Sequence, residues 1–393
     1  MTSAFKNVIK KLASNRWFMP GLLLGISILI SMQSILLGVH HFWAGNYTFY
    51  NNFVIFKFSF RHLIENKNLY EHYPNQYADL YKYSPTFALI MCFFYYLPDS
   101  IGLVLWNSVN IFVLYYAISL LKSIDASKKI FIVLFLLPEL ILSTGNSQSN
   151  ALIAGLTILS FNLFEKGKNS YAIFFILLGA FIKIYSITGL ILFLLYPNKL
   201  KSLLGILFWT IALFLVPLIV VDFGDLISQY KNWYQLLKAD EGQSIGMSLF
   251  LYTQFILPLN DYKLLTLLFG GLILITPLFR HKQYSHELFR IRYLSFILVW
   301  MVAFNHKSES PTFVIAMSGI GIWFFSSKQS PISTALVILT FIFTSIWFTD
   351  LIPDALKTYF IRLEYIKSFF PVLVLFAIYY GLLLKKTKLK HST

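Results

Sequence analysis

Long apolar stretches alternate with short polar segments along most of this 393-residue chain. The apolar stretches have the length of helices and lack the strict alternation that marks the strands of a membrane barrel. Since only helices and closed barrels satisfy their backbone groups in lipid, the pattern predicts membrane-spanning helices. We predict twelve of them, near residues 18–39, 100–121, 130–146, 149–164, 170–183, 185–197, 202–221, 263–279, 289–304, 311–326, 332–349 and 366–384.

Two regions depart from the usual span length of about 17 to 25 residues. Residues 84–98 are only 15 long, and we predict a helix that dips into the outer leaflet and returns. Residues 170–197 are predicted as two spans of about 13 residues each. The alternative is that 170–197 forms one helix and that 84–98 crosses the membrane. These two changes cancel, so the C-terminus stays on the same side of the membrane.

The composition supports a polytopic membrane protein of the all-α class. Hydrophobic residues make up 57% of the chain and charged residues 12%, against about 25% charged residues in soluble domains. No hydrophilic segment is long enough for a second domain, so residues 1–393 are predicted to form one integral membrane domain. The single cysteine, Cys92, excludes an intramolecular disulfide.

The net charge of +15 predicts the orientation of the chain in the membrane. With twelve spans, 20 of the 32 basic residues fall in the segments on one side, together with only three of the 17 acidic residues. The positive-inside rule makes that side cytoplasmic. We therefore expect a multi-pass protein of the inner (plasma) membrane with both termini in the cytoplasm. Nucleic-acid binding would require a basic surface on a soluble region, and the sequence contains no such region.

The outer face then carries four main segments and a more peripheral one at 350–365. The four are 40–99, 145–150, 222–262 and 305–310. The first loop holds polar residues among aromatic ones and includes a predicted amphipathic helix over 56–70. The second large loop, 222–262, is predicted to form an amphipathic helix and a lid over the site. Because polar groups gathered between apolar spans are the first place to look for chemistry, we place the active site at 40–99.

Asp79 and Lys82 lie three residues apart, just before the apolar stretch at 84. One interpretation is a carboxylate and an ammonium at the lipid–water boundary, beside a phosphate-bearing lipid. The other is a surface ion pair that fixes the loop. In the same loop His72 is a further candidate for substrate binding.

Three other segments carry candidate chemistry. The turn GNSQSN contains Asn146 and Gln148 at a helix start, which suits either sugar or phosphate binding or ordinary capping. Lys183 lies within an apolar stretch, where it either snorkels or binds a lipid phosphate. Glu139 is a second charge at membrane depth, and such charges face a cavity or a partner.

The turn NHKSES brings His306, Lys307 and Glu309 together between two spans. A histidine near a carboxylate suits proton transfer, and the alternative is a solvated polar turn. The chain has no Walker A loop, GxSxG, HExxH, DxD or paired-cysteine motif. Their absence argues against ATP-driven transport, serine hydrolysis and zinc proteolysis.

The order and spacing of these segments resemble the family-87 glycosyltransferases, which have the polytopic GT-C fold. The segments that carry the resemblance are the LY pair at 69–70, YKYSPTFALIMCFFYYLP at 81–98, Trp106 with Asn107, GNSQSN at 145–150, GAFIKIYS at 179–186, QSIGMSL at 243–249 and NHKSESP at 305–311. The resemblance implies an active site on the extracytoplasmic face. It also implies a polyprenyl-phosphate sugar donor, often mannose, and inverting transfer to a glycolipid or glycan.

The chain departs from this family at one position. The family usually has an aspartate about 18 residues before the LY pair as general base, and here the matching residue is Asn52, or its neighbour Asn51. An amide cannot take a proton at neutral pH. Either another carboxylate serves, in the order Asp79, Glu309, Glu71, or the activity is reduced or different.

These observations lead to a predicted membrane glycosyltransferase. The candidate catalytic residues are Asp79, Glu309, His306 and Asn52, and the candidate substrate- and phosphate-binding residues are Lys82, Lys183, Lys307, His72, Asn146 and Gln148. The predicted partners are the donor, the acceptor and the bilayer, without a cofactor, although Asp79 and Glu309 leave a shared divalent metal open. The alternatives are a flippase or polymerase for lipid-linked glycans, and a non-catalytic membrane scaffold.

Overall fold

A computed structural model describes residues 15, 17–42, 45–240, 245–256, 262–349, 351–353 and 364–384. The two basic termini and most of 350–365 lie outside the described residues. The first half contains α2 (Phe18–Leu37), β1 (Val39–Phe42), β2 (Gly45–Thr48), α3 (Asn51–Ile64), α4 (Pro85–Ile90), α5 (Cys92–Tyr95), α6 (Asp99–Ser119), α7 (Ala126–Gly145), α8 (Asn150–Glu165), α9 (Asn169–Ile182) and the 3₁₀-helix η1 (Ile184–Leu195). The second half contains α10 (Lys199–Leu215), η2 (Val216–Ile219), α11 (Phe223–Asp240), α12 (Phe250–Ile256), α13 (Tyr262–Ile275), η3 (Thr276–Phe279), η4 (His281–Gln283), α14 (Glu287–Ala303), η5 (Ser310–Thr312), α15 (Phe313–Ser326), α16 (Pro331–Thr340), the π-helix η6 (Phe341–Ile346) and α18 (Glu364–Leu384).

The predicted all-α class is confirmed, apart from the two-stranded hairpin of β1 and β2, which the apolar pattern did not predict. Each predicted span coincides with a helical segment. Within the described residues, five helices are long and apolar enough to cross a membrane: Phe18–Leu37, Asp99–Ser119, Lys199–Ile219, Tyr262–Phe279 and Tyr365–Leu384. The chain is therefore a multi-pass membrane protein.

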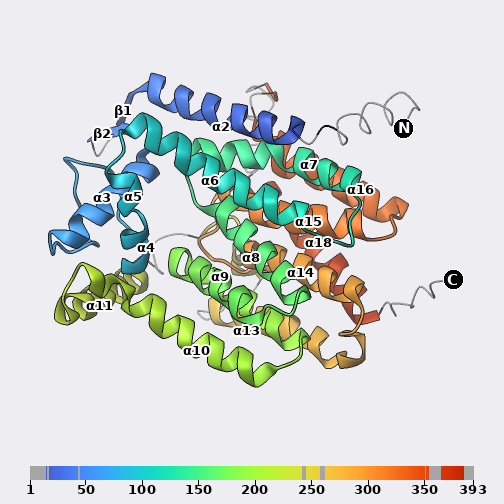
Figure 1. Ribbon diagram of the computed structural model, residues 1–393. Helices are drawn as coiled ribbons and strands as arrows, with labels where there is room; N and C mark the ends of the chain where they lie inside the picture. The colour runs from blue at the N-terminus through green and yellow to red at the C-terminus, as the bar shows by residue number, and fades with distance from the viewer. Residues whose placement is uncertain are drawn as a thin grey trace.

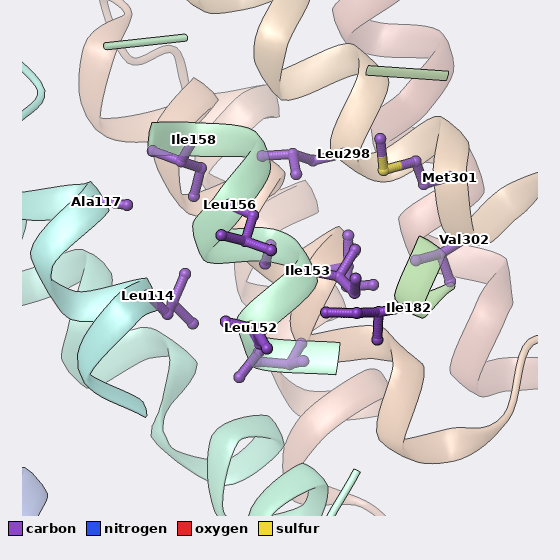
Figure 2. Packing of buried hydrophobic residues seen from close by; sticks show 14 of the residues in the cluster. Leu114, Ala117, Leu152, Ile153, Leu156, Ile158, Ile182, Leu298, Met301 and Val302 are labelled. Atoms are coloured by element: carbon purple, nitrogen blue, oxygen red, sulfur yellow. The ribbon is translucent and has the colours of Figure 1, made fainter. Parts of the chain in front are cut away.

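Helix α8 forms the centre of the bundle, and nearly all of its residues are buried. Figure 2 shows its apolar side chains between those of α6 on one side and α14 on the other, with Ile153 and Leu156 directed into this core. Gly155 permits the close approach of α6, because a Cβ there would lie 2.7 Å from the Leu114 backbone nitrogen. Small residues are common where membrane helices touch.

The two ends of the bundle are closed by different polar contacts. At one end the Arg290 guanidinium donates to both oxygens of Glu165, at 2.6 and 2.7 Å, and the Tyr196 hydroxyl donates to the same carboxylate. At the other end the Lys183 ammonium donates to Asn150 Oδ1 at 2.7 Å. We call these the Glu165 end and the Lys183 end. Figure 1 shows α3, α4 and α11 at the Lys183 end, whereas α2 begins and α18 ends at the Glu165 end.

Helix α9 and η1 form a hairpin. This agrees with the prediction that residues 170–197 form two short segments. The amide of Asn169, at the start of α9, donates to the carbonyl of Pro197, just beyond the end of η1, at 3.1 Å. A 12-residue 3₁₀-helix spans about 24 Å, against about 18 Å for an α-helix of that length. The tighter winding therefore lets a short segment match its neighbours.

Residues 84–98 turn back, as predicted, and do not form one continuous helix. Ser84 caps α4 by accepting a hydrogen bond from the Phe87 backbone, and Pro85 occupies the first turn. Both ends of the segment contact α3, through the ring of Phe56 on Tyr83 and through Lys57, which donates to the Leu97 carbonyl.

The amphipathic helix predicted over 56–70 is displaced. The observed helix, α3, covers 51–64 and buries more than half of its residues against the protein, so it is not a free surface helix. The displacement arises because Asn51 and Asn52 extend the helix backwards, while the chain turns at Asn66, whose φ is 54°.

One buried histidine on α3 predicts a pH dependence of stability. His62 is fully buried, stacks on Tyr73 with ring centroids 3.8 Å apart, and hydrogen-bonds Gln76 at 2.8 Å. Burial lowers the pKa of His62 below its ordinary 6.5, with Lys67 and Arg61 acting in the same direction.

Because the unfolded chain then binds the proton more readily, the free energy of unfolding should decrease as the pH falls below 6.5, by up to about 1.4 kcal/mol per pH unit. Unfolding of the micelle-embedded protein between pH 7.5 and 5.5 measures this. A His62→Gln variant should show a weaker dependence, and an equal dependence would assign the effect to other groups. Glu65 stays ionised throughout, since hydrogen bonds from Arg61 and Lys67 hold its pKa at about 2.

Candidate active site

A polar network at the Lys183 end surrounds the ammonium of Lys183, between α9 and η1. Lys183 Nζ donates to Asn150 Oδ1 at 2.7 Å and to Gln148 Oε1 at 3.2 Å. The Asn150 amide donates to Gln148 Oε1 at 2.6 Å, and the Tyr185 hydroxyl donates to Asn150 Oδ1 at 3.1 Å. Gln148 and Asn150 are buried, so the ammonium is held by amide oxygens in the interior.

Gln148 extends this network to a carboxylate. Its Nε2 donates to Glu309 Oε2 at 2.8 Å. Glu309 is exposed and precedes η5, where its side chain accepts from the backbone of Thr312 in a capping box. One glutamine side chain therefore links an ammonium and a carboxylate, in what we call the Lys183 group: Lys183, Gln148, Asn150, Tyr185 and Glu309.

A second cluster, the Asp240 group, comprises Asp240, Lys82, Lys307 and Asp79. Lys82 Nζ lies 3.6 Å from both Asp79 Oδ1 and Asp240 Oδ1, and Lys307 Nζ lies 3.7 Å from Asp240 Oδ2. The contacts join the first loop, the end of α11 and the turn after α14. They are long and partly exposed, and pairs of this kind contribute little to stability. Asp240 therefore pairs with two ammonium groups through contacts that are individually weak.

The Asp79 side chain is positioned by a turn that Asn51 holds. The Asn51 amide exchanges two hydrogen bonds with the backbone of Ala78, at 2.8 and 3.1 Å. Asp79 then adopts φ of 72°, and its carboxylate accepts from the Leu80 nitrogen at 2.7 Å. Aspartate and asparagine tolerate this left-handed conformation better than other residues with side chains.

Tyr83 is within electrostatic range of one carboxylate of each group. Burial raises the pKa of Tyr83, and the negative charges of Glu309 and Asp79 raise it further. Its ring packs edge-on against Phe56, with centroids 4.8 Å apart, and Phe56 in turn contacts Trp106. The negative charges of both groups therefore act on one aromatic residue at the Lys183 end.

Comparison with protein-family profiles matches residues 81–304, more than half of the chain, to glycosyltransferase family 87. The chain belongs to glycosyltransferase family 87. Membership of this family identifies the chain as a membrane glycosyltransferase, as the sequence predicted. A search of curated proteins found no match to it.

The matched region of this family-87 glycosyltransferase contains most of the basic and amide groups of the site, including Lys82, Gln148 and Lys183. It also contains Asp240, which our reading of the sequence did not single out. The match begins after Asp79 and ends before Glu309. The two first candidates for the general base therefore lie just outside it.

The structure gathers six of the ten predicted site residues into the two groups: Asp79, Lys82, Lys307, Gln148, Lys183 and Glu309. Asn52 and Asn146 contact each other instead, since the Asn52 amide donates to the Asn146 carbonyl at 2.9 Å. The Asn146 amide caps its own helix through Leu142.

The two predicted histidines occupy different surroundings. The His306 ring contacts Phe250 in the turn before Glu309. His72 is exposed, and within the described part of the chain no hydrogen bond or ion pair joins it to either group.

The sequence left open a divalent metal shared by Asp79 and Glu309. Within the ranges that the structure describes, no three histidine, cysteine, aspartate or glutamate side chains come together as a metal site.

A segment of the second large loop packs directly on the turn that contains His306 and Glu309. The backbone nitrogen of Gly246 donates to the His306 carbonyl at 2.6 Å, and that of Met247 donates to the Ser308 carbonyl at 2.7 Å. A Cβ at position 246 would lie 2.4 Å from the Ser308 oxygen, so the contact requires glycine.

Gly246→Ala is therefore expected to displace the turn, with a cost of about 1–3 kcal/mol, and to lower transferase activity. Activity and thermal unfolding in nanodiscs would measure both effects. Gly224→Ala is the matched control, because nothing lies within 4 Å of a Cβ there. Equal activity in the two variants would show that this packing is unimportant for the site.

Proposed function

We propose that this family-87 glycosyltransferase moves a sugar, mannose in the first instance, from a polyprenyl-phosphate donor to a hydroxyl of a glycolipid or glycan. The observation that carries the proposal is the link of Lys183 to Glu309 through Gln148. It supplies a cation for a departing phosphate and a carboxylate for an attacking hydroxyl within one network. The approach of lipid-linked substrates along the bilayer supplies proximity.

The reaction is a single displacement with inversion. The Glu309 carboxylate takes the proton of the acceptor hydroxyl as the acceptor oxygen bonds to the anomeric carbon. The bond from that carbon to the phosphate oxygen breaks, and polyprenyl phosphate leaves with the electron pair. Lys183 stabilises the charge that develops on the phosphate. Lys82 and Lys307 bind the phosphodiester of the donor, and later the phosphate of the leaving group, in place of the Asp240 carboxylate.

Glu309 is a better base than Asp79 on geometric grounds. Both carboxylates accept hydrogen bonds, but Glu309 belongs to the same network as Lys183, whereas Asp79 lies 3.6 Å from Lys82 and outside that network. Asn52 is a positioning residue in this proposal, since its amide joins α3 to the carbonyl of Asn146.

The proposed orientation puts the Lys183 end on the extracytoplasmic face of the plasma membrane. The start of α2 and the end of α18 lie at the Glu165 end (Figure 1), where Arg280 donates to the Leu382 carbonyl of α18 at 2.6 Å and Arg290 pairs with Glu165. A concentration of basic residues is typical of the cytoplasmic side, which supports cytoplasmic termini.

The test is acceptor-dependent release of polyprenyl phosphate by the purified protein in nanodiscs, given polyprenyl-phosphate mannose and a crude lipid extract. Release that requires both the protein and the extract is expected. Movement of the intact donor between leaflets without release would favour a flippase. Absence of both, with several polyprenyl-phosphate sugars, would favour a non-catalytic scaffold.

A further inference from the structure

A cavity at the Glu165 end contains an unusual combination of charge and burial. It has a volume of about 170 Å³ and is lined by the last turns of α15, the start of α16, and parts of α14 and α18. Its polar wall includes Arg292, Lys328 and Ser327, and its apolar wall includes Trp323 and Phe324. Helices α14 and α15 run from this cavity to the active-site turn, so the two sites lie at opposite ends of the same helices.

Arg292 is the central group of this cavity. It is only 7% exposed, and its Nη1 donates to the Gly381 carbonyl at 3.2 Å. A guanidinium has five N–H donors, and a buried charge without a counterion is strongly unfavourable. Among the ion pairs formed by the described residues, none includes Arg292, whereas Arg290, two residues earlier, takes both oxygens of Glu165.

The rest of the polar wall also favours an anion. Lys328 is exposed and lines the cavity, and none of the ion pairs among the described residues includes it. Ser327 Oγ is buried and has no hydrogen-bond partner within the part of the chain that the structure describes. Helix α16 starts in the same wall at Pro331, and the N-terminus of a helix carries partial positive charge.

The surroundings indicate an anion with apolar chains. Ile332, at the start of α16, is 82% exposed, and Leu384, one turn beyond Gly381 on α18, is 63% exposed. In a membrane protein such side chains face acyl chains. Basic pockets between membrane helices on the cytoplasmic side bind the headgroups of anionic lipids.

We propose that this cavity, the Arg292 cavity, binds the phosphate of an anionic membrane phospholipid, with its acyl chains on the exposed faces of α16 and α18. The guanidinium of Arg292 forms the buried contact and the ammonium of Lys328 the contact at the rim. A lipid in this position bridges α14, α15, α16 and α18. The proposal does not depend on the reaction at the other end of the bundle.

Thermal unfolding in neutral micelles, with and without added phosphatidylglycerol, tests the proposal through Arg292→Met. Methionine keeps much of the packing but removes the charge. The wild type should unfold several degrees higher with phosphatidylglycerol, and the variant should not respond. In neutral micelles alone the variant should be at least as stable as the wild type, because an unpaired buried charge is gone. A variant less stable under both conditions by the same amount would show a structural arginine and overturn the proposal.

Lys328→Gln provides a second test that does not touch the interior. Native mass spectrometry should show at least a tenfold loss of phosphatidylglycerol affinity in Arg292→Met and a smaller loss in Lys328→Gln. Lys282→Gln removes an exposed charge in η4, outside the cavity wall, and should bind as the wild type does. Equal losses in all three variants would indicate diffuse surface attraction and overturn the site. Displacement of the lipid by an equal concentration of inorganic phosphate would overturn its assignment to a lipid.

Discussion

Glu309→Gln is expected to lower the rate of sugar transfer by about 10²- to 10⁴-fold, the usual contribution of a general base. Glutamine has nearly the same shape and keeps one side-chain oxygen, which can accept from Gln148 Nε2 or from the Thr312 backbone. It cannot accept a proton at neutral pH. The release of polyprenyl phosphate in nanodiscs measures the rate, and thermal unfolding should change by less than about 0.5 kcal/mol.

Asp79→Asn is the matched comparison, because it makes the same chemical change in the other carboxylate near Tyr83. We expect its rate to fall far less than that of Glu309→Gln. The Asp79 side chain is 63% exposed and helps to hold its own turn through the Leu80 nitrogen, which asparagine can also do. The reverse order of the two rates would make Asp79 the base and leave Glu309 as a capping residue. Unchanged rates in both would exclude either as the base.

Much of the architecture could be predicted from the sequence, because lipid imposes one constraint on every span. A backbone in hydrocarbon must satisfy its own hydrogen bonds, so apolar runs of helical length become helices. The return of 84–98 towards α3 was also predictable, since this run is short and begins with Ser84 and Pro85, a capping residue and a helix-starting residue. The 3₁₀ winding of η1 was not predictable, because it depends on the length that its neighbours α8 and α9 impose.

The composition of the site was predictable only in part. Lys82, Lys307 and Glu309 stood out as charges in short polar segments. Asp240 did not, because it ends an amphipathic helix that has several other charges, and its role comes from contacts with Lys82 and Lys307 far away in the sequence. The charge pattern did contain one unused signal: Lys367, like Glu139, lies in an apolar segment, and two opposite charges at membrane depth indicate a pair.

The structure forms that pair between α7 and α18. Lys367 Nζ lies 2.9 Å from Glu139 Oε1, and the two side chains are 0% and 1% exposed. The ammonium also lies over the rings of Phe313 and Phe348, at 5.4 and 4.8 Å from their centroids. Because Phe313 begins α15 directly after η5, the pair supports the turn that carries the proposed base.

Lys367→Met is expected to destabilise the protein by about 3–5 kcal/mol, because it leaves Glu139 buried and uncompensated. Adding Glu139→Gln should recover most of that loss, since the double variant no longer buries a charge, and replacing both partners of a buried pair is often nearly neutral. Unfolding of the single and double variants in micelles measures the coupling between the two positions. If the losses of the single variants simply added, the two side chains would act independently and the pair would not hold α18 on α7. Strong coupling would instead explain how a charge at membrane depth, costly by itself, is retained beside the turn that carries the proposed base.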